Sequence, residues 1–112
     1  MRQQMDPRIA DRAAALFGAM ANPARLRIVE LLQEQPLAVG EIAHRLGLGQ
    51  SGASQHLAVL ARAGVLVVEQ KGTSRIYHVR GPRIGKIVAL IEEFCRVHAL
   101  SGPEDIEPEG SA

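Results

Sequence analysis

The sequence predicts a mostly α-helical domain that carries one small β-hairpin near its C-terminal end. Apolar residues recur at helical spacing in five segments, and only residues 65–79 change to the alternation of paired strands. Two of the helical segments are short and joined by a glycine-containing turn, directly before the hairpin. At 112 residues, with 46% hydrophobic and 22% charged residues, the chain suits a single folded domain.

The first two helices each have a clear start signal in the sequence. Asp6-Pro7 and Asn22-Pro23 both place a capping residue before a proline, whose missing N–H costs nothing in the first helical turn. The first helix is expected to end near Ala21 and the second near Gln35. The apolar positions of the first helix are Ile9, Ala13, Leu16, Phe17 and Met20. Both helices should therefore be amphipathic and pack on a common core.

Residues 41–63 are predicted to form two helices joined by a tight turn. The first begins at Glu41, the segment Gly47-Leu48-Gly49 interrupts it, and Ser51 is expected to cap the second before Gly64 ends it. The start of the second helix carries short, almost uncharged donors and acceptors: Gln50, Ser51, Ser54, Gln55 and His56. Base edges in a major groove are read by hydrogen bonds. The pattern therefore predicts a DNA-binding helix-turn-helix.

The β-hairpin follows the second helix of this motif. Residues 36–40 are expected to be a short connection into the motif, and residues 65–68 and 74–79 to be the two strands of the hairpin. The turn between the strands carries Lys71, Thr73 and Arg75, which would let the hairpin act as a wing that reaches phosphates or a minor groove. Tyr77 is expected to lie in the core. The fold class is therefore a winged helix-turn-helix.

Positive charge collects around this motif, although the net charge of the chain is only +1. Between residues 41 and 86 the acidic residues are Glu41 and Glu69, against seven basic residues: Arg45, Arg62, Lys71, Arg75, Arg80, Arg83 and Lys86. Phosphate neutralisation would use such an excess. Double-stranded DNA is the expected partner. Arg25 and Arg27 in the second helix are interpreted as solvated charges with packed stems.

The last helix begins at Gly81-Pro82 and carries an apolar stripe that is wide for one small domain. We expect this helix and the first one to form a homodimer interface, which would also supply the two reading helices that palindromic half-sites need. The predicted interface residues are Leu16, Phe17, Ile84, Ile87, Val88, Ile91, Phe94 and Cys95. Residues 1–102 should form the folded domain, and the acidic residues 103–112 a disordered tail.

Several classes of protein are disfavoured by the sequence. One cysteine gives no internal disulfide, and neither a signal peptide nor an 18-residue apolar run is present, so a cytoplasmic protein without membrane association is expected. No phosphate loop, carboxylate pair or activated nucleophile is evident. An enzyme is therefore not expected, and neither is a cofactor.

Taken in order, these segments resemble the ArsR/SmtB family of bacterial winged-helix repressors, over roughly residues 12–98. The matching segments are residues 19–28, 39–43, 48–60, 63–66 and Ile76-Tyr77. The resemblance implies a homodimer that occupies an operator palindrome and blocks transcription until an inducer acts. It also implies that Ser51, Ser54, Gln55 and His56 face DNA and that Arg75 is a wing contact.

The sensing sites of that family are incomplete in this sequence. The resemblance would place a Cys-x-Cys pair where Ala38 and Gly40 stand, and an Asp-x-His where Arg83-Ile84-Gly85 stands. Cys95 and His98 retain half of the second site, so no metal centre is expected. The inducer is unknown.

The thiol chemistry of the family is also incomplete. Redox-responsive members pair two cysteines, and the first position holds Glu30 here, which leaves Cys95 alone. A lone cysteine on an apolar helix face is usually a small buried hydrophobe. Two alternatives stay open at this point: a repressor that responds through the single thiol of Cys95, and a winged-helix module for protein association without its own operator.

Overall fold

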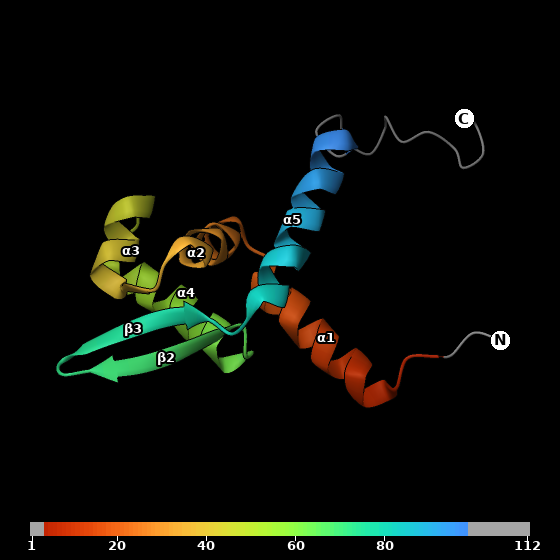
Figure 1. The fold of residues 1–112 in the computed structure, drawn as a ribbon, viewed down its shortest axis with the longest axis horizontal. Helices are drawn as coiled ribbons and strands as arrows, with labels where there is room; N and C mark the ends of the chain where they lie inside the picture. The colour runs from red at the N-terminus through yellow and green to blue at the C-terminus, as the bar shows by residue number, and fades with distance from the viewer. Residues whose placement is uncertain (1–3, 99–112) are drawn as a thin grey trace.

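The computed structural model describes residues 4–98 and confirms the winged helix-turn-helix (Figure 1). The helices are α1 (Pro7–Met20), α2 (Pro23–Glu34), α3 (Val39–Leu46), α4 (Gln50–Arg62) and α5 (Pro82–Val97). The strands are β1 (Leu37–Ala38), β2 (Leu66–Lys71) and β3 (Ser74–Val79). The predicted tail, residues 103–112, lies outside the described residues. No helix within residues 4–98 is long and apolar enough to cross a membrane.

The predicted starts of α1 and α2 are confirmed. The carboxylate of Asp6 accepts the backbone N–H of Arg8 at 2.8 Å, and the side-chain oxygen of Asn22 accepts that of Arg25 at 3.1 Å. These bonds satisfy N–H groups that have no partner within the first turn of a helix. Hydrogen bonds from Arg8 also hold the pKa of Asp6 below its ordinary value.

Two details between α2 and α4 differ from prediction. Residues 37–38, expected to be a loop, form strand β1, which pairs with Ile76 and Tyr77 of β3, so the sheet is three-stranded and antiparallel in the order β1-β3-β2. Helix α3 then begins at Val39 and not at Glu41. A two-residue strand has no periodicity of its own and is defined by its distant partner.

The turn between α3 and α4 ends α3 with a glycine in the left-handed conformation. Gly47 has φ +66°, and the N–H of Leu48 donates to the carbonyl of Ala43 at 2.9 Å, as in a Schellman motif. The N-cap of α4 is Gly49, without a side-chain hydrogen bond, so the prediction that Ser51 caps this helix is wrong. Helix α4 begins at Gln50, one of the two starts that the sequence allows, which places Ser51 within its first turn.

The core lies where α2, α3, α4 and the sheet meet. Its buried members come from all of these elements and from the end of α1: Ala19, Met20, Ile28, Val29, Leu32, Ile42, Leu57, Leu60, Val65, Leu66 and Tyr77. The prediction that Tyr77 belongs to the core is confirmed. Helix α5 contributes no buried residue, and Figure 1 shows its C-terminal half projecting away from the other elements. The core therefore holds α4 and the hairpin in place, whereas one side of α5 is not covered by the rest of the described chain.

The end of α4 depends on Gly64, and replacing it with alanine is expected to destabilise the fold by about 1–3 kcal/mol. Gly64 has φ +86°, a backbone conformation that alanine adopts only with strain, and an added Cβ would also displace the guanidinium of Arg12. Its carbonyl also accepts Nε–H of Arg80 at 2.7 Å. Urea unfolding measures the change in the free energy of unfolding.

Gly40→Ala is the matched control for that experiment. Gly40 is exposed in the first turn of α3, and nothing lies within 4 Å of the position its Cβ would take. This substitution is expected to stabilise by about 0.4–1 kcal/mol, because alanine restricts the unfolded chain. Equal effects of the two substitutions would contradict the role given to Gly64.

Candidate nucleic-acid interface

Helix α4 has one side in the core and one side open to solvent. Ala53, Leu57 and Leu60 are fully buried against the rest of the domain. The residues on the opposite side are exposed and form what we call the outer stripe: Ser51, Ser54, Gln55, Ala58 and Arg62. Apolar residues three or four positions apart fix this orientation. The side chains of the outer stripe therefore remain available to a partner.

The chemistry of the outer stripe suits a DNA groove. Its hydroxyl and amide groups both donate and accept hydrogen bonds, and α4 contains no acidic residue. Ala58 and Arg62 belong to this surface but were not predicted as site residues. Ala58 and Arg62 follow Ser54 and Gln55 at helical spacing, so the sequence pattern was sufficient to place them on the same exposed side.

The other two predicted residues of α4 lie at the margin of the outer stripe. Gln50 is exposed at the first position of the helix. His56 is half-buried, and its Nδ1 lies 3.4 Å from Nη1 of Arg25, so it lies partly against α2. The predicted set is therefore brought onto one helix, although His56 is less accessible than its neighbours.

The hairpin forms a wing that extends beyond the helices (Figure 1). Strands β2 and β3 pair in register from Leu66 and Val79 to Lys71 and Ser74, which leaves Gly72 and Thr73 as a two-residue turn. Gly72 has φ +60°, a conformation that hairpin turns of this length require and that glycine adopts without strain. The three predicted wing residues, Lys71, Thr73 and Arg75, are all exposed.

Both acidic residues between positions 41 and 86 are paired with a basic side chain. Nε–H of Arg45 donates to Glu41 at 2.9 Å, and this hydrogen bond lowers the pKa of Glu41 from its ordinary value. Nε2 of His78 lies 2.8 Å from a carboxylate oxygen of Glu69. The ion pair with Arg45 reduces the repulsion that the carboxylate of Glu41 would exert on phosphates. The surface is therefore favourable to a polyanion.

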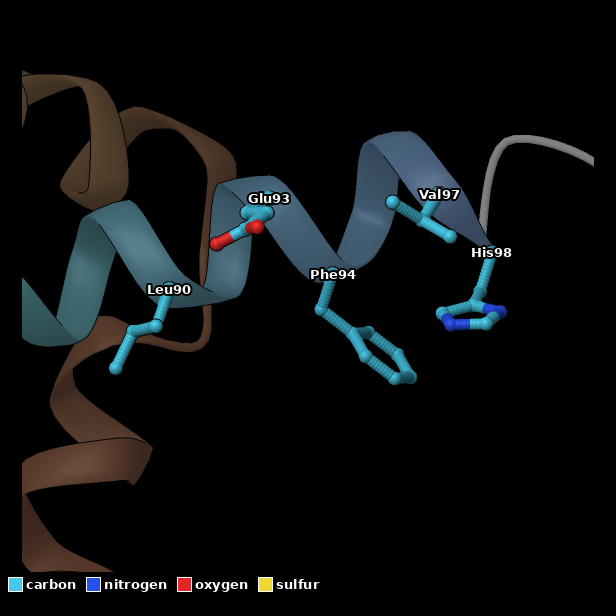
Figure 2. A pocket seen from close by; sticks show the side chains of 5 residues that line it. All are labelled: Leu90, Glu93, Phe94, Val97 and His98. Atoms are coloured by element: carbon cyan, nitrogen blue, oxygen red, sulfur yellow. The ribbon is translucent and has the colours of Figure 1, made fainter.

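Large apolar side chains are also exposed on α5 and on α1. Leu90, Ile91, Phe94 and Val97 of α5 are 46–67% exposed, and Ile9 and Phe17 of α1 are each 57% exposed. Figure 2 shows Leu90, Phe94 and His98 projecting from the same side of α5, and the Phe94 and His98 rings lie 4.8 Å apart. An apolar surface of this kind is typical of a protein interface.

The predicted dimer residues divide into two groups. Phe17, Ile91 and Phe94 are exposed, and Ile87 and Cys95 are half-buried. The other three pack against the core of the same chain and offer only part of their surface: Leu16, Ile84 and Val88. Ile9, Leu90 and Val97 are exposed on the same helices but were not in the predicted set.

The candidate sensing residues form no cluster within the described chain. Cys95 is a free, half-buried thiol on α5. Among residues 4–98, no three side chains of His, Cys, Asp or Glu lie close enough together to hold a metal ion.

Known proteins share both the sequence and this geometry. The family described as a helix-turn-helix domain matches residues 20–69. The HTH-type transcriptional regulator Rv0081 of Mycobacterium tuberculosis is 39% identical over 106 residues, which cover 88% of this chain and 90% of that protein. A solution structure from Mycobacterium bovis, the homodimeric winged helix-turn-helix DNA-binding domain of a possible ArsR-family transcriptional regulator, superposes with a TM-score of 0.75. The chain belongs to the ArsR/SmtB family.

The family assignment covers nearly the whole described chain. The Mycobacterium bovis domain is 31% identical, and the alignment spans 88% of this chain and 94% of that domain. The transcriptional activator HlyU of Vibrio cholerae is 34% identical across 86% of this chain and 89% of its own length. The chain is therefore a winged helix-turn-helix transcriptional regulator.

Proposed function

We propose that this regulator is a homodimeric repressor that reads a palindromic operator in double-stranded DNA. The observation that carries the proposal is the outer stripe of α4, which is polar, free of acidic residues and exposed beside a basic wing. In the proposed complex the start of α4 enters the major groove, with contacts from Gln50, Ser51, Ser54, Gln55 and His56. Lys71, Thr73 and Arg75 of the wing hold phosphates or a flanking minor groove.

The exposed apolar surface of α5 and α1 supports the homodimer. A twofold interface uses the same surface on both chains, so the bare side of α5 would cover itself in a second copy. Pairing would also place two α4 helices on successive half-sites, as an operator palindrome requires. The Mycobacterium bovis domain is described as homodimeric, which adds support from a relative.

Repression is the direction that needs the fewest additional features. A dimer that occupies an operator excludes other proteins from the same DNA, whereas activation needs a further surface for the transcription machinery. HlyU carries the name of an activator, so the family contains that alternative. Activity in the cytoplasm, with residues 1–102 as the folded domain, is part of the proposal.

The input to this repressor is proposed to differ from the metal sites of the family. Ala38, Gly40 and Gly85 stand at ligand positions of those sites but offer no metal-binding side chain, and the arginine at position 83 repels a cation. A response through the single thiol of Cys95 remains the second candidate, because the thiol is free and half-buried on the proposed interface helix.

Gln55→Ala and Arg75→Ala are expected to weaken DNA binding in different ways. Gln55 is proposed to read a base, so its loss should cost about 1–3 kcal/mol on the cognate duplex and little on random DNA. Arg75 is proposed to hold a phosphate, so its loss should weaken both and lower the salt slope by about 0.9 for each contact. Fluorescence anisotropy titrations at several salt concentrations measure both effects.

Arg96→Ala is the control for the charge lost in that experiment. Arg96 is an exposed arginine near the end of α5, paired with Glu92 and remote from α4 in the sequence. Its removal should leave the salt slope unchanged. Equal losses from the two test substitutions on cognate and random duplexes would contradict the roles assigned to Gln55 and Arg75.

A further inference from the structure

The side chain of Arg25 joins three helices. Its Nε–H donates to the carbonyl of Ala19 at the end of α1, and its Nη1 lies 3.4 Å from Nδ1 of His56 on α4. Its own backbone N–H is held by Asn22 at the start of α2. Arg25 is half-buried, which agrees with the expected packed stem, but its guanidinium has two protein contacts and is not the solvated charge that we expected. The guanidinium instead has a fixed place between α1 and the DNA-reading helix.

The contact with Arg25 determines how His56 holds its proton. A guanidinium offers only donors and does not lose its proton in proteins, so the imidazole nitrogen that faces it must accept. Nδ1 of His56 therefore carries the lone pair, and the proton of the neutral ring lies on Nε2. The second nitrogen is then a hydrogen-bond donor.

The position of His56 on α4 leaves part of its ring open to a partner. Nδ1 of His56 contacts Arg25 of α2, whereas Nε2 has no hydrogen-bond partner among the described residues and is not buried. Gly52 lies one turn earlier on α4, and a Cβ added at this position would have no neighbour within 4 Å. Because side chains on a helix lean toward the preceding turn, no bulky neighbour on α4 shields the imidazole at this end.

We propose that Arg25 is a positioning residue that holds His56 as an Nε2–H donor for an acceptor on DNA. The acceptor is a phosphate oxygen or a base acceptor in the major groove, namely a purine N7, guanine O6 or thymine O4. This inference rests on the proposed function, because it assigns the direction of one hydrogen bond within the same interface. It also gives α1 a direct link to α4 through Arg25.

The variants His56→Asn and His56→Gln test two parts of the proposal separately. These parts are the hydrogen bond from Arg25 to Nδ1 and the Nε2–H donor toward DNA. In His56→Asn the amide oxygen can replace Nδ1 and keep the bond from Arg25, but the donor toward DNA is lost. In His56→Gln the longer amide can place an N–H near the position of Nε2 while the bond from Arg25 is lost. We expect His56→Asn to lose about tenfold in affinity per half-site and His56→Gln to lose less.

A larger loss of affinity in His56→Gln than in His56→Asn would overturn the proposal. It would mean that the bond from Arg25 matters more than the Nε2–H donor, as expected for a purely structural histidine. A comparison of cognate and random duplexes identifies the acceptor. Equal losses of affinity on both duplexes indicate a phosphate, and a loss confined to the cognate duplex indicates a base edge.

The tautomer is measured separately in the free protein. Long-range ¹H–¹⁵N NMR spectra of the imidazole should show a protonated Nε2 and an unprotonated Nδ1 in the wild type, and loss of this preference in Arg25→Met. A ring protonated at Nδ1 at neutral pH would overturn the assignment. If the wild type binds no duplex, the proposed function fails, and the NMR result still decides the role of Arg25.

Discussion

Phe94→Asp is expected to convert the protein from a dimer to a monomer. Phe94 is 58% exposed at the centre of the apolar side of α5, so in the proposed dimer its ring is covered by the second copy. Losing a buried aromatic side chain costs about 3 kcal/mol, and the substitution occurs in both chains. The dissociation constant of the dimer should therefore rise by about 10⁴-fold, at roughly 1.4 kcal/mol for each factor of ten.

The oligomeric state is measured by sedimentation velocity over a range of concentrations. Ala89→Asp is the matched control, because Ala89 is an exposed residue of the same helix, one turn before Glu92 and Glu93, and receives the same carboxylate. This variant should remain dimeric. A Phe94→Asp variant that sediments as a dimer at micromolar concentration would show that the apolar side of α5 is not the interface.

Ser54→Asp is expected to abolish operator binding without unfolding the domain. Ser54 is exposed in the middle of the outer stripe, so a carboxylate there disturbs no core contact. In the proposed complex the new charge would lie close to phosphates. At about 5 Å and an effective dielectric constant of about 20, the repulsion is about 3 kcal/mol for a single phosphate. The affinity should fall by more than about 100-fold for each half-site.

Anisotropy titration of a fluorescent duplex measures this loss, and urea unfolding confirms that the fold is intact. Ala89→Asp serves again as the control, because it adds the same charge on α5. If Ser54→Asp binds the operator as tightly as Ala89→Asp does, α4 is not the helix that meets DNA.

The elements with local signals were predictable from the sequence. The starts of α1 and α2 follow from Asp6-Pro7 and Asn22-Pro23, which act within one turn of the chain. The wing followed from a change in period and from Gly72. Strand β1 was missed because only its pairing with β3, nearly 40 residues later, makes it a strand. Ser51 was misassigned because serine is also compatible with the first turn of a helix.

The predicted DNA-facing residues lie together because one helix carries most of them, so their spacing was sufficient. Contacts between helices were not accessible in the same way. Arg25 was interpreted as solvated, since nothing near it in sequence reveals the carbonyl of Ala19 or the ring of His56. Likewise the wide apolar stripe of α5 was visible, but the sequence did not separate Ile84 and Val88, which pack on the core, from Phe94, which is exposed.

The central claim is that a dimer of this chain reads a specific DNA sequence through α4. The most direct test titrates the full chain into a duplex from upstream of its own gene, and into a scrambled duplex of equal length, at physiological salt. The account predicts two chains per cognate duplex and an affinity at least about 10³-fold higher than for scrambled DNA. Equal affinity for the two duplexes, or binding by a single chain, would contradict it.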